Sequence, residues 1–99
     1  MPEVTRVTAD KHVGHDCPEV PLPFHKFAYS TGSIDVLTNG FPTVRIGDST
    51  SCGDPAVAGS STVFVNGIPV HRKDDATGGH GCWVPNKSES GAADVIAGD

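Results

Sequence analysis

Apolar and polar residues alternate along two short stretches of the chain, and an Asn-Gly pair interrupts each stretch. Alternation with a period of two is typical of half-buried strands. Asn-Gly favours a two-residue type I′ turn, because both residues tolerate a positive φ. The pattern therefore predicts two β-hairpins, and no segment has the 3.6-residue apolar period of a substantial helix. The predicted strands and turns are 33–38 and 41–46 around Asn39-Gly40, and 61–65 and 68–73 around Asn66-Gly67, with Val65 facing Ile68.

The two predicted hairpins are copies of one another. Residues 32–50 and 59–77 align without gaps at an offset of 27 residues, and 9 of the 19 aligned positions are identical. Such a repeat indicates that each copy is one supersecondary unit, which buries a face by packing against the other units.

A third copy is split between the two ends of the chain. Residues 91–98 resemble the first strand of a unit, and Arg6, Val7 and Asp10 resemble its second strand with one residue inserted. We therefore expect the termini to lie close together. The predicted fold is mainly β: a small closed cone of three pseudo-threefold related hairpins with long loops, the third hairpin made from the C-terminal and N-terminal strands.

Length and composition narrow the functional classes. The 99 residues predict a single domain, residues 1–99. Only 36% of the residues are apolar, so the core should be modest and need a disulfide or a metal as a tie. The net charge of −5 argues against a nucleic-acid partner. The chain lacks a long apolar window and an apolar signal region, which predicts no membrane span and synthesis in the cytoplasm.

Candidate metal ligands occur in register in the loops that follow the repeated aspartates. His15 lies five residues after Asp10, Cys52 lies four after Asp48, and His80 lies five after Asp75. Three units related by a pseudo-threefold axis would direct these three side chains towards one point. A fourth candidate, His71, replaces Val44 of the other copy at a position expected to face inward.

Three imidazoles and one thiolate would form a closed tetrahedral site that suits one structural zinc ion per chain. Iron in place of zinc stays open. Other roles for the four residues also stay open: His71 could be a core histidine, Cys52 a buried thiol, and His15 and His80 solvated loop residues. Cys17 or Cys82 could replace a ligand, or the two could form a disulfide with each other. His12 and His25 are interpreted as surface or loop residues.

Catalytic interpretations have weaker support. A Cys-His nucleophile pair is conceivable, but no motif orients one, and the chain has no GxSxG, HExxH or phosphate-binding loop. A hydrolytic zinc would need a general base. Asp16, Glu19 and Asp75 are the available carboxylates, and we interpret them as solvated surface groups. The sequence therefore predicts that the protein is not an enzyme.

From Val4 to Asp99 the chain resembles the PAAR-repeat family in its order of motifs. The shared pattern is Gly-Ser, alternating strand residues, Asn-Gly, Pro-x-x-Arg, Gly-Asp and a Cys- or His-bearing loop. The Pro-Ala-Ala-Arg motif reads Pro42-Thr43-Val44-Arg45 and Pro69-Val70-His71-Arg72 here, which keeps proline and arginine but not the alanines. Asp74-Asp75 departs from the Gly-Asp step.

The resemblance implies a short β cone with zinc near its sharp end, held by His15, Cys52, His71 and His80. Proteins similar to this one cap the central spike of contractile injection machines, such as phage tails and type VI secretion systems. One monomer would sit on the flat end of a trimeric β-helical spike and pierce an outer membrane when the machine contracts. The chain shows no toxin extension, so we expect a bare tip. The alternatives are a small cytosolic zinc-binding adaptor with another protein partner and, less favoured, a zinc or thiol enzyme.

Overall fold

The computed structural model describes residues 2–15, 17, 26–81 and 83–98, and these residues form two antiparallel hairpins and no helix. β1 (Leu37–Thr38) pairs with β2 (Phe41–Pro42), and β3 (Phe64–Val65) pairs with β4 (Ile68–Pro69). This confirms the mainly-β fold class and the pairing of Val65 with Ile68. The strands are shorter than predicted. Thr43 still donates to residue 36 of its own hairpin, but Val44 and Ile46 donate to Thr5 and Pro69 of neighbouring segments (3.0 Å each). Within the described residues no helix is long and apolar enough to span a bilayer.

Both hairpin turns have the backbone conformation that their sequence predicts. The φ angles are 53° at Asn39 and 84° at Gly40, and 55° at Asn66 and 77° at Gly67. Two successive positive φ values are what a type I′ turn requires, and its twist matches the twist of the flanking strands.

A closed ring of backbone hydrogen bonds joins the two hairpins to the N-terminal segment. The N–H of Thr5 donates to the carbonyl of His71 (3.0 Å), His71 donates to Val44 (2.9 Å), and Val44 donates to Thr5 (3.0 Å). Each segment thus bonds to both of the others, and the three positions are equivalent in the repeat. The ring runs around a pseudo-threefold axis.

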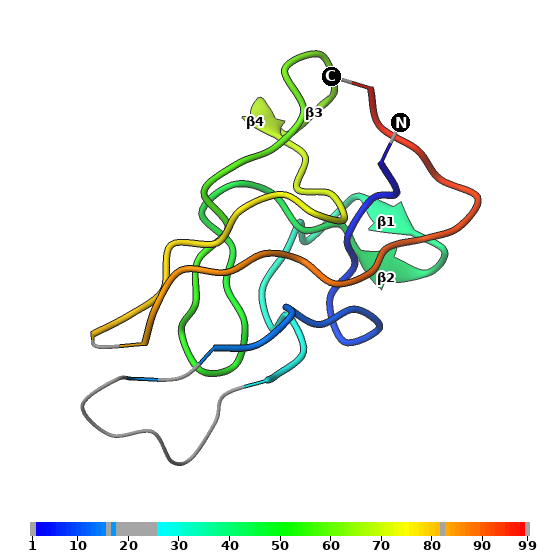
Figure 1. The fold of residues 1–99 in the computed structure, drawn as a ribbon. Coiled ribbons are helices and arrows are strands. Elements are labelled where there is room, and N and C mark those ends of the chain that lie inside the picture. Colours follow the sequence, from blue (N-terminus) through cyan, green and yellow to red (C-terminus); the bar gives the residue numbers. More distant parts are fainter. Residues whose placement is uncertain (1, 16, 18–25, 82, 99) are drawn as a thin grey trace.

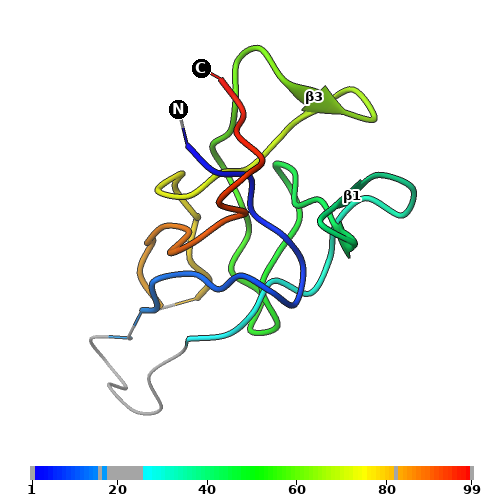
Figure 2. The same ribbon diagram turned by 90° about the vertical axis from the view of Figure 1, so that its right-hand side faces the viewer.

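The N-terminal and C-terminal segments lie side by side, as predicted (Figure 1, Figure 2). Glu3 and Ile96 form an isolated antiparallel bridge, and the N–H of Val4 donates to the carbonyl of Val95 (2.9 Å). Equivalent bonds of 3.1 Å join residues 43 and 36 in one hairpin and residues 70 and 63 in the other. The terminal segments therefore repeat part of the hairpin bonding, through a single bridge rather than a named strand pair.

Arginine–aspartate pairs confirm the alignment of the three units. In each pair the arginine Nε and its backbone N–H both donate to one carboxylate oxygen, at distances between 2.8 and 3.0 Å. The N-terminal pair is four residues apart and the others are three apart, which matches the single inserted residue. The pairs are Arg6–Asp10, Arg45–Asp48 and Arg72–Asp75.

The apolar core is small and divides into two clusters near the axis. One contains Val7, Tyr29, Val44 and Ala56, and the other contains Val4, Val70 and Ala97. Many of the other buried side chains are threonine, serine, aspartate or histidine. A core of this size gives limited hydrophobic stabilisation, so the fold depends on polar contacts and on ties between loops.

The termini and the loop that bears Cys52 lie at different ends of the molecule. In Figure 1 the termini and the β3–β4 hairpin lie at the top, the β1–β2 hairpin lies at mid-height, and the loop around residues 51–56 lies towards the bottom. Figure 2 shows the same separation from the side.

Candidate metal centre

Two loops bring a group of metal-ligating side chains together at the loop end of the molecule. His12, His15 and Cys52 each offer a ligand atom, and these atoms all lie within 4.8 Å of one another. His12 and His15 follow Asp10 in the first unit, and Cys52 follows Asp48 in the second. The structure thus gathers two residues of the predicted set, His15 and Cys52, with one that was not predicted.

His12, which the sequence predicts to be a surface or loop residue, is fully buried, so a surface position is wrong. Its Nδ1–H donates to Oδ2 of Asp54 over 2.7 Å. Its other ring nitrogen, Nε2, is buried and has no hydrogen-bond partner among the described residues. A buried polar atom without a partner is costly, so Nε2 is suited to bind a metal ion in this position.

The sequence did carry a signal for His12. It lies two residues after Asp10, and the residues two after Asp48 and Asp75 are Thr50 and Thr77. All three side chains at this repeated position are buried. Histidine in place of threonine at an inward position is the same kind of substitution that drew attention to His71.

His15 is almost fully buried, and its Nε2 faces Cys52 of the same group. Its Nδ1 lies 2.7 Å from the carbonyl oxygen of Val84. A carbonyl oxygen can only accept a hydrogen bond, so Nδ1 carries the proton and Nε2 has the lone pair. Nε2 lies 3.7 Å from Sγ of Cys52. The two histidines therefore have matching tautomers, set by two different acceptors.

A tight turn holds Cys52 in place. The backbone N–H of Thr50 donates to the carbonyl of Asp54 (3.1 Å), and the N–H of Gly53 donates back to Thr50 (2.9 Å). Gly53 has a φ of 94°, where glycine is favoured. The hydroxyl of Thr50 accepts from the N–H of Asp54 and lies 3.2 Å from the sulfur of Cys52. Cys52 is not in a disulfide.

Asp54 lies behind His12 and is fully buried. Its Oδ1 accepts from the N–H of Gly79 (2.7 Å), and its Oδ2 accepts from the side-chain amide of Asn86 (2.6 Å) as well as from His12. Burial raises the pKa of Asp54, but these hydrogen bonds, with that of Thr77, outweigh it and lower the pKa to about 2. The carboxylate is therefore ionised at neutral pH.

His80 lies beside the group. Its ring packs edge-on against that of His15, with ring centroids 4.9 Å apart, and it stacks on Trp83 at 5.5 Å. Three of the four predicted ligands, His15, Cys52 and His80, thus share one neighbourhood.

His71 lies elsewhere, in the core. Its Nδ1–H donates to the carbonyl of Ala58 (2.8 Å), and its Nε2 accepts from the hydroxyl of Tyr29 (2.8 Å). Both ring nitrogens have protein partners. The imidazole takes the position that Val44 has in the other unit, and there it accepts a hydrogen bond from a buried tyrosine, which an apolar side chain could not do. Burial lowers the pKa of His71, which keeps the ring neutral.

Of the other cysteines, Cys17 is disulfide-bonded, as one of the open alternatives allowed. Its sulfur is therefore not available as a metal ligand. Cys82, His25, Asp16 and Glu19 lie outside the described residues.

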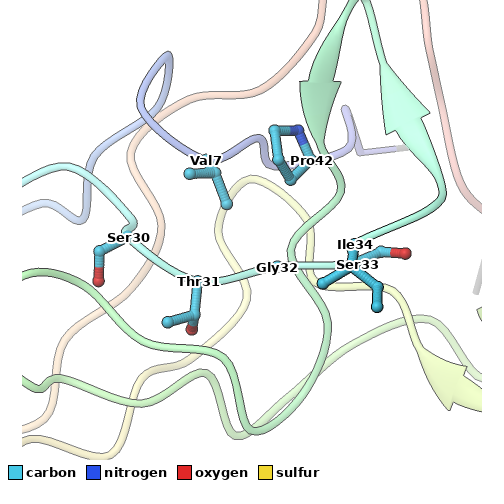
Figure 3. A pocket seen from close by; sticks show the side chains of 7 residues that line it. All are labelled: Val7, Ser30, Thr31, Gly32, Ser33, Ile34 and Pro42. Atoms are coloured by element: carbon cyan, nitrogen blue, oxygen red, sulfur yellow. The ribbon is translucent and has the colours of Figure 1, made fainter.

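Two hollows lie away from the histidines. One of about 430 Å³ lies between Val7, Pro42 and the segment 30–34, and its lining has no ionisable side chain (Figure 3). The other, of about 240 Å³, lies between the hairpins and the terminal segments. Residues from three equivalent positions of the repeat line this hollow. They are Val36, Val63 and Val95 at the first position, Thr38, Val65 and Ala97 at the second, and Thr43, Val70 and Val4 at the third.

The side chains in the candidate centre are chemically consistent with a structural metal ion. Imidazole and thiolate are the ligands that zinc prefers in closed tetrahedral sites. Both histidines are fixed by acceptors at Nδ1, which is the usual arrangement for histidines that bind a metal through Nε2. The group could therefore hold a metal ion and tie the first two loops together.

A comparison with family models gives an independent result. The model described as PAAR motif matches residues 32–86, which include both hairpins, Cys52 and His80. A comparison with curated proteins found no match. The family match covers more than half of the chain, including both continuous copies of the repeat, and the chain therefore belongs to the PAAR-motif family.

Proposed function

We propose that this protein is the structural tip that caps the trimeric β-helical central spike of a contractile injection machine, either a phage tail or a type VI secretion system. Residues 1–99 would act as one PAAR-like domain, with one monomer on each spike trimer. The observation that carries this proposal is the threefold repetition of backbone bonds within one chain of this family. A pseudo-threefold monomer can offer three similar edges to a partner with true threefold symmetry.

The surface at the hairpin end supports docking of such a partner. Leu37, Phe64 and Ile96 occupy equivalent positions in the three units, and each is more than half exposed. The hollow of about 240 Å³ lies among these units. An apolar surface repeated around an axis is suited to cover the flat end of a trimer.

At the opposite end we propose one structural zinc ion, bound by His12, His15 and Cys52, with His80 as the fourth ligand. His71, which the sequence suggested as a ligand, is replaced by His12 in this set because both nitrogens of His71 have protein partners. Zinc would stabilise a narrow end whose volume is too small for an apolar core. It would act mechanically, so we propose no enzymatic activity.

The protein would be made in the cytoplasm and assembled on the spike, and contraction would drive it through an outer membrane. The test is binding to the purified trimeric spike protein of the same machine, measured by native mass spectrometry and by titration. We expect one chain per trimer. Phe64→Asp should weaken binding at least about tenfold, because an apolar side chain worth roughly 1.5–3 kcal/mol loses its burial.

Val57→Asp is the matched control, since Val57 is 51% exposed, Phe64 is 54% exposed, and Val57 lies outside the hairpins. This variant should bind like the wild type. A wild-type protein that binds zinc but not the spike trimer would refute the cap and favour the zinc-binding adaptor with another protein partner.

A further inference from the structure

Asp54 is a buried carboxylate that contacts a member of the candidate metal group. Its side chain is fully buried, and Oδ2 lies 2.7 Å from Nδ1 of His12. It does not belong to the group itself, because its oxygens already accept from His12, Gly79 and Asn86.

We propose that Asp54 is a positioning residue for the metal centre, which fixes the tautomer of His12 and supplies a second negative charge beside Cys52. The inference rests on the proposed metal site and goes beyond it. An ionised carboxylate can only accept, so the proton of a neutral His12 must lie on Nδ1. The lone pair is then on Nε2, the buried nitrogen that has no hydrogen-bond partner among the described residues.

The charges in this region lead to the same conclusion. A divalent ion bound by neutral histidines and one thiolate has a net charge of +1, which is costly to bury. The carboxylate of Asp54 makes the buried assembly neutral. Hydrogen-bonded carboxylates behind a ligating histidine typically change metal affinity by about 10- to 100-fold when they are replaced.

Asp54 also connects the loops of three units. Its backbone N–H donates to Thr50, beside Cys52, and its side chain reaches Gly79 and Asn86 of the third-unit loop. A purely structural role in this network is the competing explanation, so the test must separate the two.

The decisive variant is Asp54→Asn, which keeps the size of the side chain but brings an amide donor. An amide N–H facing His12 would force the proton onto Nε2, the nitrogen that faces the metal. Two quantities are measured: the zinc affinity, by competition with a chromogenic chelator, and the His12 tautomer in metal-free protein, by ¹⁵N NMR. We expect an affinity loss of about 10- to 100-fold and a shift of the proton to Nε2.

Thr77→Val is the matched structural control. The hydroxyl of Thr77 accepts from the backbone and side chain of Asn86 and also bonds to Asp54, so its loss disturbs the same network but leaves the contact between Asp54 and His12 in place. We expect this variant to be less stable, with zinc affinity within about threefold of the wild type and the proton still on Nδ1.

The wild type gives a further check if Asp54→Asn does not fold, because its His12 should carry the proton on Nδ1. A proton on Nε2 in the wild type would overturn the inference, and so would equal affinity losses in the two variants. Failure of the wild type to bind zinc would overturn the proposed metal site as well. Tight zinc binding by both the wild type and Asp54→Asn would overturn the inference alone.

Discussion

The hydrogen bond between Tyr29 and His71 gives a quantitative test of how the core is built. Tyr29→Phe removes the hydroxyl that donates to Nε2 of His71 over 2.8 Å. Both side chains are fully buried, so water cannot replace the lost donor. A buried acceptor left without a partner costs about 1–3 kcal/mol. For a domain of this size that corresponds to a fall in melting temperature of roughly 5–20 °C.

The assay is urea unfolding of zinc-saturated protein with the disulfide intact, carried out for Tyr29→Phe, His71→Leu and the double variant. His71→Leu also loses the bond to Ala58, but this loss is common to the single and double variants and cancels in the cycle. We expect the double variant to be more stable than additivity predicts, with a coupling of about 1 kcal/mol or more. A Tyr29→Phe variant as stable as the wild type, or strictly additive effects, would refute this account of the core.

Two further predictions follow from the same packing. Burial lowers the pKa of His71, so unfolded chains, whose histidine pKa is about 6.5, bind a proton that the folded chain does not. The free energy of unfolding should therefore fall as the pH is lowered from about 6.5 through the depressed pKa of the folded chain, and it should fall less in His71→Leu. The measurement is the shift of the urea midpoint between about pH 7.5 and about pH 5.5, and equal shifts in the wild type and in His71→Leu would contradict this. At Gly59 an added Cβ would lie 2.6 Å from the backbone carbonyl oxygen of residue 70, so Gly59→Ala should lower the free energy of unfolding in urea by about 1–3 kcal/mol. Ser61→Ala, at an exposed position, is the control and should change it little. Equal stability of the two variants would contradict the prediction.

The sequence was sufficient to predict the fold class, because repetition and turn chemistry are local. The Asn-Gly turns and the pairing of Val65 with Ile68 follow from residues next to one another in the chain. The closeness of the termini followed from the split third copy. What the sequence could not show was how far each strand pairs within its own hairpin before it bonds to another unit.

The candidate metal centre was predicted in part, for a physical reason. His15 and Cys52 were found because the repeat places them in register. His12 and His71 both replace smaller residues at inward positions, and their roles depend on which side chain lies across the axis. Tyr29 lies three residues before Gly32, and the equivalent residues before Gly59 and Gly91 are the smaller Ala56 and Ser88. The partner of His71 therefore could not be inferred from the repeat.

The most direct test of the proposed metal centre is elemental analysis of protein purified without added metal, together with Ala variants at His12, His15 and Cys52 and the variant His71→Leu. We predict about one zinc per chain in the wild type, as for closed structural sites. Zinc should be lost in each of the three Ala variants and retained in folded His71→Leu. A wild-type protein without metal, or loss of zinc from a folded His71→Leu variant with retention in His12→Ala, would contradict the proposed metal centre.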